Sequence, residues 1–535
     1  MKALLMHRDR DFDPHESLRD VMYGYRDARR NLGLQLSGHD RALIQDLELN
    51  VLLQAMAGGD EFLFEVVRKA ILSGCRNDLE TILYRQEALK DCLKNATVVR
   101  QLYEVTVEAT EETRKRWWNV SSYQHPSSIL YSAIDMLEVL SQKLRKLRSI
   151  DEEQAGLFES EAFRALFAML QKELSDEYLT RIENHLSDVK FRKGVLLSAE
   201  LDDRNQGTNY MLRRSSKQEP NWFKRMLGKG PPAYTFYIAE RDQAGAEILS
   251  DMRHRGISRV AVALAHSSEH VLDFFKMLRT ELGFYIGCLN LRDRLAAQGS
   301  SFCFPVPFAT GQRKHQFRGL YDVCLALQMN RKIVPNDVDA DGKHLVVITG
   351  ANQGGKSTFL RSIGIAQLMM QTGLFVGAGM FEAELTPAIF THYKREEDVS
   401  MKSGKFDEEL ARMSDIADSI VPNAIVLFNE SFAATNEREG SEIARQIVCA
   451  LLERRVKAFY VTHLYTFART FAETNDGQAL FLRAERNPDG TRTFRLMEGQ
   501  PLETSYGEDL YREIFEREGR GPSGESNGAT SVVSV

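Results

Sequence analysis

The sequence predicts a multidomain protein of the α plus α/β class. A helical region with a small β-containing insert is followed by a P-loop α/β domain. Three observations support this. A long, nearly proline-free stretch carries apolar residues at three- and four-residue steps, which is typical of helices. A short turn-rich interval interrupts it. The last part alternates strand-like and helix-forming runs, which predicts a mostly parallel sheet.

The composition is that of a globular chain of several domains. It has 535 residues, of which 43% are hydrophobic and 27% charged. No apolar run is long enough to cross a membrane and Met1–Asp13 is charged, so we expect neither a membrane segment nor a signal peptide. The six cysteines form no CxxC pair, which favours thiols in a reducing cytoplasm. Because the net charge is −6, any contact with DNA must come from local basic patches.

The helical pattern begins near His39. Apolar residues recur through Ile134–Leu147, and a second helical stretch covers Glu159–Leu186. The helical pattern returns over Gln243–Leu295, although Val260–Leu264 could be a strand. The segments that we expect are an N-terminal segment 1–38, a helical region 39–189, a β-rich insert 190–240, a second helical region 241–318, an α/β domain 319–518 and a Gly/Ser-rich disordered tail 519–535.

The β-rich insert is predicted from turn residues between apolar runs. Val195–Glu200 and Asn209–Leu212 flank the turn-rich Asp202–Thr208, which indicates a hairpin. Tyr234–Ala239 is predicted to be another strand because it is aromatic and apolar.

The last domain is predicted from regular strand–helix alternation. Its expected strands and helices are Val346–Thr349, helix 357–371, Ala424–Phe428, helix 441–455 and Ala458–Thr462.

A phosphate-binding loop follows the apolar run Leu345–Thr349. Glycines allow backbone N–H groups to converge on phosphates, Lys356 reaches the β- and γ-phosphates, and Ser357 offers a hydroxyl to Mg²⁺. The alternative is a glycine-rich turn that binds no nucleotide. The residues expected to bind ATP here are Gly350, Ala351, Asn352, Gln353, Gly354, Gly355, Lys356, Ser357 and Thr358.

A second element of the nucleotide site follows Ala424–Phe428. Glu430 is placed to orient or deprotonate the attacking water, and Asn429 occupies the position where an aspartate normally holds the hydration shell of the metal. An amide oxygen brings no charge, so the affinity for Mg²⁺ should fall. The alternative is a buried strand that ends in a capping Asn-Glu pair.

Two further residues are candidates because of their positions. His463 follows a strand of the same sheet and can sense the γ-phosphate or the attacking water, although a lone histidine there is more often structural. Ser403 and Gly404 precede a helix and can make a second anion site, which a dimer with ATP between two subunits would use. An ordinary helix cap is the alternative.

With these motifs in order, the chain resembles the MutS family. The resemblance runs from Leu320 to about Leu510 and more loosely through the helical region, where Asp78–Leu93 and Phe284–Leu295 are similar to family segments. The stretches that carry it are Ile348–Ala378, Phe406–Glu409, Leu427–Glu430, Thr435, Gly440, Thr462–His463 and Ser505–Gly507. The resemblance implies that 319–518 is an ABC-type ATPase domain that forms a homodimer with composite ATP sites. It also implies that 39–189 is a helical core or lever, that 241–318 is the helical lever return, and that 190–240 is a clamp-like insert of the kind that closes a DNA channel.

The chain also departs from the family pattern. Asn429 replaces an aspartate, and Ser403 stands one place earlier than the usual serine. The loop after Glu430 lacks the glycines and arginine typical of repair enzymes. We find no N-terminal mismatch-reading domain and no C-terminal nuclease module, so a wedge at mispairs is not implied and nuclease-tailed relatives are excluded.

The clamp-like insert holds the candidate DNA contacts. Trp222 and Phe223 are interleaved with basic residues, a composition that suits phosphate contact and stacking, although a solvated loop would have the same charges. The basic residues are Arg213, Arg214, Lys217, Lys224, Arg225 and Lys229.

The leading hypothesis is therefore a dimeric MutS-like ATPase that moves helical arms on DNA, in repair or recombination. A nucleotide-gated clamp with little or no hydrolysis is the alternative that Asn429 suggests. A structural-maintenance type of ATPase would need sustained heptads, which are not seen.

Overall fold

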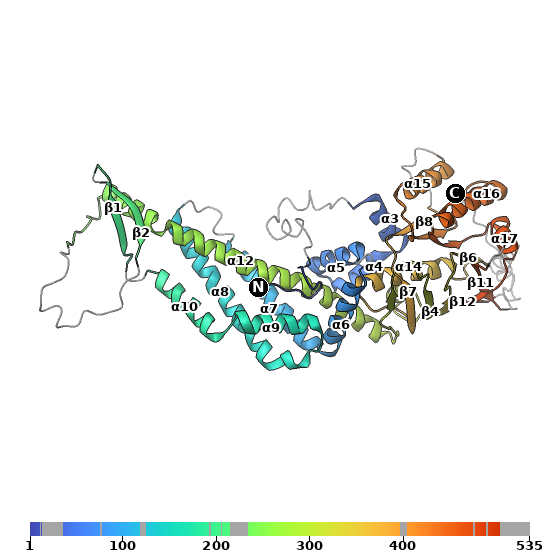
Figure 1. Cartoon of the computed structure of the whole chain (residues 1–535), viewed down its shortest axis with the longest axis horizontal. Coiled ribbons are helices and arrows are strands. Elements are labelled where there is room, and N and C mark those ends of the chain that lie inside the picture. Colours follow the sequence, from blue (N-terminus) through green and yellow to red (C-terminus); the bar gives the residue numbers. More distant parts are fainter. Residues whose placement is uncertain are drawn as a thin grey trace, which may run out of the picture. The chain divides into compact units, whose positions relative to one another are not determined.

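A computed structural model describes eleven stretches of the chain: residues 1–10, 12, 36–74, 78–117, 125–191, 194–204, 206–213, 234–395, 404–474, 477–487 and 491–502. The chain forms two compact units (Figure 1). Unit 1 comprises Met1–Leu32 and Glu87–Leu289, and unit 2 comprises Gly33–Gln86 and Asn290–Val535.

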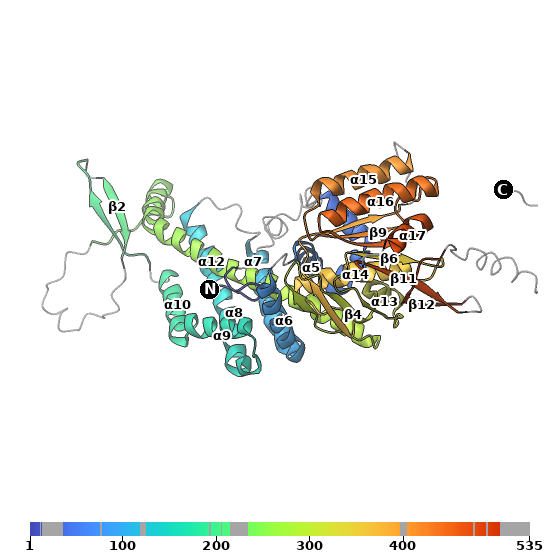
Figure 2. The same cartoon turned by 45° about the vertical axis from the view of Figure 1, so that its right-hand side comes forward.

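Unit 1 is built from long helices, as the periodicity predicts. α7 and α8 lie side by side along much of their length (Figures 1 and 2). One apolar cluster joins Leu130 and Ile134 of α8 to Leu186 of α10 and Ile257 of α12. The helices are α7 (Ala96–Trp117), α8 (Pro126–Gln154), the short 3₁₀ helix η1 (Ala155–Leu157), α9 (Glu161–Glu173) and α10 (Asp176–Val189). The division between the units falls within α6 (Leu79–Lys94) and α12 (Gln243–Ala297).

The predicted hairpin is confirmed. β1 (Leu197–Leu201) pairs antiparallel with β2 (Gly207–Leu212). The strand predicted at Tyr234–Ala239 is wrong, because these residues form no regular structure and Tyr237 is 94% exposed. An aromatic run forms a strand only beside a partner strand, and among the described residues none pairs with it.

The possible strand at Val260–Leu264 is also wrong, because these residues lie inside the 55-residue helix α12. The β-branched Val260 and Val262 favour strands only weakly, and packing within a helical layer overrides that preference.

Unit 2 contains the predicted, mostly parallel sheet. Its six strands are ordered β12-β11-β6-β10-β9-β8, all parallel except the β11–β12 pair. They are β6 (Leu345–Thr349), β8 (Ile389–Tyr393), β9 (Ile425–Asn429), β10 (Lys457–Val461), β11 (Ala479–Arg486) and β12 (Arg492–Glu498).

A second, mixed sheet of four strands has the order β3-β7-β4-β5. The strands are β3 (Val306–Phe308), β4 (His315–Leu320), β5 (Asn336–Asp339) and β7 (Met380–Glu384). Helix α14 (Lys356–Thr372) contacts strands of both sheets and is buried along almost its whole length. The expected helix 357–371 is therefore present, and it lies at the centre of the unit.

Other helices pack on the sheets, on α14 or on one another. α15 and α16 lie on the side of the six-stranded sheet opposite α14 (Figure 2). These helices are α3 (Gly38–Asp46), α4 (Leu49–Ala57), α5 (Glu61–Ser73), α13 (Val323–Met329), α15 (Lys405–Ser419), α16 (Glu437–Glu453) and α17 (Tyr465–Glu473).

The compact units and the expected segment boundaries differ at two places. Residues 33–86 belong to unit 2 instead of to the helical core, and β3 and the start of β4 precede residue 319 but pair with β7. Long-range strand pairing of this kind leaves no local signal in the sequence. The functional segments that the sequence suggests therefore stay a proposal. In the described part of the chain, no helix has the length and hydropathy to cross a membrane.

Candidate nucleotide site

The site lies where three parallel strands end. β6, β10 and β9 are neighbours, so their carboxyl ends meet at one edge of the sheet. The loop 350–355 follows β6, Asn429 and Glu430 end β9, and Thr462 and His463 follow β10. The three elements predicted separately in the sequence are thus brought together.

The loop after β6 needs its glycines for space and for backbone conformation. Gly350 has φ +110°, and a Cβ there would lie 2.8 Å from the backbone nitrogen of Ala484 on β11. A Cβ on Gly354 would lie 2.6 Å from the Cβ of Ala484. Gly355 has φ +86° at the start of α14. The loop therefore packs against β11 and turns its backbone toward the N-terminus of a helix, which favours bound anions.

The side chain of Lys356 is buried against the loop 350–355. Its Nζ donates to the carbonyl oxygens of Gly350 at 3.0 Å and Ala351 at 2.9 Å. The residue is only 5% exposed, and this burial lowers the pKa of Lys356 to about 8, an effect that the charge of Glu430 partly opposes. A cation held by neutral carbonyls in a buried loop lacks an anionic partner, which a bound phosphate would supply.

Asn429 and Glu430 take different roles. The hydroxyl of Ser357 donates to Oδ1 of Asn429 at 2.9 Å, so the two proposed metal-site residues are in contact. Glu430 adopts φ +54°, and its carboxylate lies 3.1 Å from Nε2 of His463. That hydrogen bond lowers the pKa of Glu430 despite the burial of the carboxyl, so it is ionised at neutral pH.

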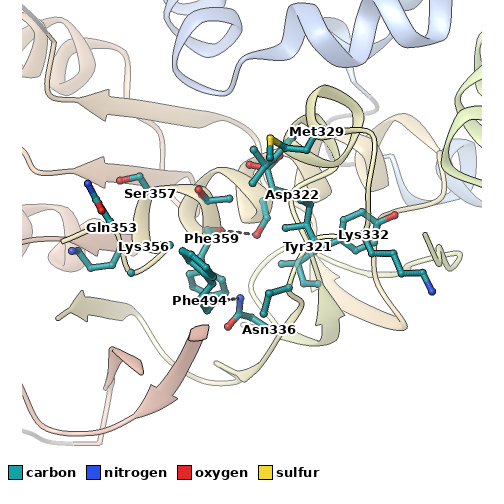
Figure 3. A pocket seen from close by; sticks show the side chains of 18 of the residues that line it. Tyr321, Asp322, Met329, Lys332, Asn336, Gln353, Lys356, Ser357, Phe359 and Phe494 are labelled. Carbon is teal, nitrogen blue, oxygen red and sulfur yellow. Dashed lines mark hydrogen bonds between the residues drawn. The ribbon is translucent and has the colours of Figure 1, made fainter. Parts of the chain in front are cut away.

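A cavity of about 640 Å³ lies beside the loop (Figure 3). Gln353, Lys356 and Ser357 line it from the loop, and Tyr321 and Met329 face them from the opposite side. With phosphates in the loop, this cavity has room for the base and sugar of the nucleotide.

This second wall is not among the residues predicted from the sequence. It is formed by two segments and one residue of β12: Leu320, Tyr321, Asp322, Leu325 and Met329; Arg331, Lys332, Ile333, Val334 and Asn336; and Phe494. Asn336 fixes the wall to β12, since its Oδ1 accepts from the N–H of Leu496 at 2.7 Å and its Nδ2 donates to the carbonyl of Phe494. The apolar pair Ile333–Val334 before Pro335 and Asn336 was the available signal, but only the tertiary fold brings it to the P-loop.

A nucleotide fits these residues better than a tightly held metal does. The loop offers converging backbone groups, a buried lysine and an adjacent cavity. The oxygens at the metal position, from Ser357 and Asn429, are both neutral. Among the described residues, no three His, Cys, Asp or Glu side chains form a metal-binding group.

Some predicted site residues lie outside the described residues. These are Ser403 and, of the basic cluster, Arg214, Lys217, Lys224, Arg225 and Lys229. Arg213 is described. It is exposed on the hairpin, where its Nε donates to the hydroxyl of Ser198 at 2.9 Å.

These features define the class of protein: unit 2 is an α/β nucleotide-binding domain with a P-loop at the end of a parallel sheet. Family comparisons narrow the class. Residues 346–513 match MutS domain V, an ABC-type ATPase domain, and residues 77–298 match the MutS2 N-terminal domain. The chain belongs to the MutS family.

Individual relatives agree with this assignment. The chain is 24% identical over 452 residues to the DNA mismatch repair protein MutS of Shouchella clausii, covering 76% of the chain and 48% of that protein. It is 25% identical over 316 residues to MutS protein homolog 4 of Mus musculus, covering 55% and 31% respectively. It is 28% identical over 193 residues to Endonuclease MutS2 of Thermus thermophilus, covering 36% and 25%. The matches thus span less than half the length of each of these relatives.

The match to MutS2 concerns the expectation about nuclease-tailed relatives. The sequence pattern predicts that nuclease-tailed relatives are excluded. The helical region nevertheless matches the N-terminal domain of MutS2, so that region is similar to a protein named as an endonuclease.

The buried lysine predicts a pH dependence of nucleotide affinity. The triphosphate binds best when Lys356 is charged, and the pKa of this lysine without nucleotide is about 8. As pH rises through this value, binding requires uptake of a proton, so affinity should fall by up to about tenfold per pH unit. Calorimetry in two buffers of different ionisation enthalpy measures both effects. Lys356→Arg stays charged and is the control; equal affinity of the wild type on both sides of this pH, with no proton uptake, contradicts the prediction.

Proposed function

We propose that the chain acts as a MutS-like, ATP-dependent DNA-binding protein. It would be a dimeric ATPase whose nucleotide cycle opens and closes helical arms on DNA, in repair or recombination. The observation that carries the proposal is the convergence of the P-loop, Asn429–Glu430 and His463 at one edge of the parallel sheet.

In this proposal the loop binds the phosphates of ATP. Lys356 exchanges its two carbonyl partners for phosphate oxygens, which are stronger acceptors. The ionised Glu430 accepts a hydrogen bond from the attacking water and orients it, and His463 holds the carboxylate of Glu430 in place. Ser357 and Asn429 would hold Mg²⁺, the latter through water, and the ion would neutralise charge on the phosphates.

A homodimer would complete each site. α15 begins at Lys405 directly after the exposed Gly404, which has no side chain to cap the helix. Its first N–H groups are therefore available to an anion. Ser403, next to this end, would contact the nucleotide of the partner subunit.

The helical arms are the long helices of unit 1. α12 is continuous over 55 residues, which corresponds to about 80 Å at 1.5 Å per residue. The basic residues near the hairpin, Arg213 among them, would contact the phosphates of DNA.

ATP turnover tests the enzymatic part. Lys356→Ala removes the phosphate-binding charge and Glu430→Gln removes the group that orients water, so each should lower kcat by about 100-fold or more. Glu430→Gln should still bind ATP, because the loop is intact. Glu442→Gln, an exposed change on α16, is the control. Equal turnover in all of these proteins would refute the ATPase proposal.

DNA binding is tested by competition among homoduplex, mismatched and four-way-junction DNA, with and without a non-hydrolysable ATP analogue. We expect tighter binding of at least one DNA in one nucleotide state. Replacing Arg214, Lys217, Lys224 and Arg225 by alanine should make log Kd less dependent on log salt concentration, the slope falling by roughly one for each phosphate that the variant no longer neutralises. Removal of four exposed lysines elsewhere gives the charge-matched control. Absence of binding to all three DNAs would contradict the proposal.

Asn429 favours a second candidate function, a nucleotide-gated clamp that hydrolyses ATP slowly or not at all. Its amide brings no negative charge to the hydroxyl of Ser357. If this explains slow turnover, Asn429→Asp should raise the affinity for Mg²⁺ and the turnover by about tenfold. Asn423→Asp, at the other end of β9, is the control. No gain in either quantity would count against the clamp.

A further inference from the structure

The turn Asp46-Leu47-Glu48, here called the α3–α4 corner, lies in unit 2 between α3 and α4. It precedes the span matched by the MutS2 model, which begins at residue 77. Glu48 adopts φ +51°, a left-handed conformation that is uncommon for residues other than glycine. This conformation directs the two carboxylates of one short turn to different elements of the ATPase domain.

The carboxylate of Glu48 holds the P-loop helix and α13. Its Oε1 forms an ion pair with Nη1 of Arg361 on α14, and its Oε2 accepts from Nε2 of Gln328 on α13 at 2.9 Å. The Arg361 side chain is only 11% exposed, whereas that of Glu48 is 42% exposed, so water screens this pair on the Glu48 side only.

Arg361 also bonds a residue in the wall of the nucleotide cavity and so links that wall to Glu48. Its Nε donates to Oδ2 of Asp322 at 2.5 Å, and Oδ1 of Asp322 caps α13 by accepting from the N–H of Leu325 at 2.9 Å. Asp322 and Leu325 line the cavity, and Asp322 is labelled there above Tyr321 (Figure 3). Burial raises the pKa of Asp322 and Arg361 opposes this effect, so the carboxylate depends on its arginine.

Leu47, between the two acids, packs directly on α14. It is fully buried, and a Cβ added to Gly364 would lie 2.9 Å from its Cδ2 and 2.7 Å from Cδ1 of Leu427. Leu427 is two residues before Asn429 on β9. Because Leu47 and Leu427 both pack against Gly364, a shift of the α3–α4 corner would displace α14 and, beside it, the strand β9 that leads to Asn429 and Glu430.

Asp46 faces α15, and its contacts are looser. Its carboxylate lies 3.8 Å from Arg412 on α15 and 3.9 Å from Arg395 after β8. Within the described residues, Oδ2 of Asp46, Nη2 of Arg412 and the hydroxyl of Tyr393 are buried without a hydrogen bond. Unsatisfied buried groups are costly, so closer pairing on this side would stabilise another position of α15.

From this arrangement we propose that the α3–α4 corner is a positioning element that couples occupancy of the nucleotide cavity to the position of α15. Glu48 sets the α13 wall through Arg361 and Asp322, and Asp46 receives the guanidinium of Arg412 when the corner moves. The inference rests on the proposed function in so far as the cavity must bind a nucleotide.

Because coupling is reciprocal, the test measures both the affinity of the cavity for nucleotide and the protection of α15 from hydrogen exchange. Glu48→Gln removes the negative charge that pairs with Arg361 and should raise the Kd for a fluorescent ATP analogue by about fivefold. It should leave kcat at saturation near that of the wild type, because Glu430 and His463 are untouched. Glu61→Gln, an exposed acid on α5, is the matched control, and Gln328→Leu removes the other partner of Glu48 should Glu48→Gln fail to fold.

Hydrogen exchange supplies a readout that a purely stabilising role would not change. In the wild type, the ATP analogue should protect amides of residues 46–51 and of α15, and this protection should be reduced in Glu48→Gln while Glu61→Gln keeps it. Unchanged Kd and unchanged protection in both Glu48→Gln and Gln328→Leu would overturn the coupling while leaving the proposed ATPase intact. A wild type that binds no ATP analogue would overturn the proposed function and the coupling with it.

Discussion

The nucleotide site depends on the backbone pairing of three adjacent parallel strands. The N–H of Thr462 donates to the carbonyl of Ile348 at 3.0 Å, and the N–H of Glu430 donates to the carbonyl of Val461 at 2.9 Å. These bonds continue the ladder beyond the ends of β6, β10 and β9. These backbone hydrogen bonds alone place the P-loop, Glu430 and His463 in one row at the edge of the sheet.

Side chains then set the chemistry within this row. Lys356 is held by carbonyl oxygens that a phosphate can replace, and Glu430 is kept ionised and oriented by His463. Asn429 accepts a hydrogen bond from Ser357, so in the proposed function it would weaken only the metal position. Phosphate binding, water orientation and metal binding would then depend on different residues of this domain.

The second sheet and the N-terminal helices form and support the far wall of the cavity, which the three strand ends do not provide. Residues 331–336 form the far wall of the cavity, and the α3–α4 corner supports that wall through Arg361 and Asp322. Two segments that lie far apart in the sequence thus act on one cavity. In the proposed function, this wall is where the rest of unit 2 would influence a bound nucleotide.

Local sequence determined the helices of unit 1, the hairpin, the P-loop and the order of the strands with their terminal residues, because periodicity and short motifs act over a few neighbours. It failed at Tyr234–Ala239, where a strand needs a partner, and at Val260–Leu264, where a long helix overrides β-branching. Only the tertiary structure decided that residues 33–86 belong with the ATPase domain, that Asn336 and Phe494 lie beside the P-loop, and that Glu48 reaches Arg361. Such contacts depend on how distant elements pack, and no spacing along the chain encodes them.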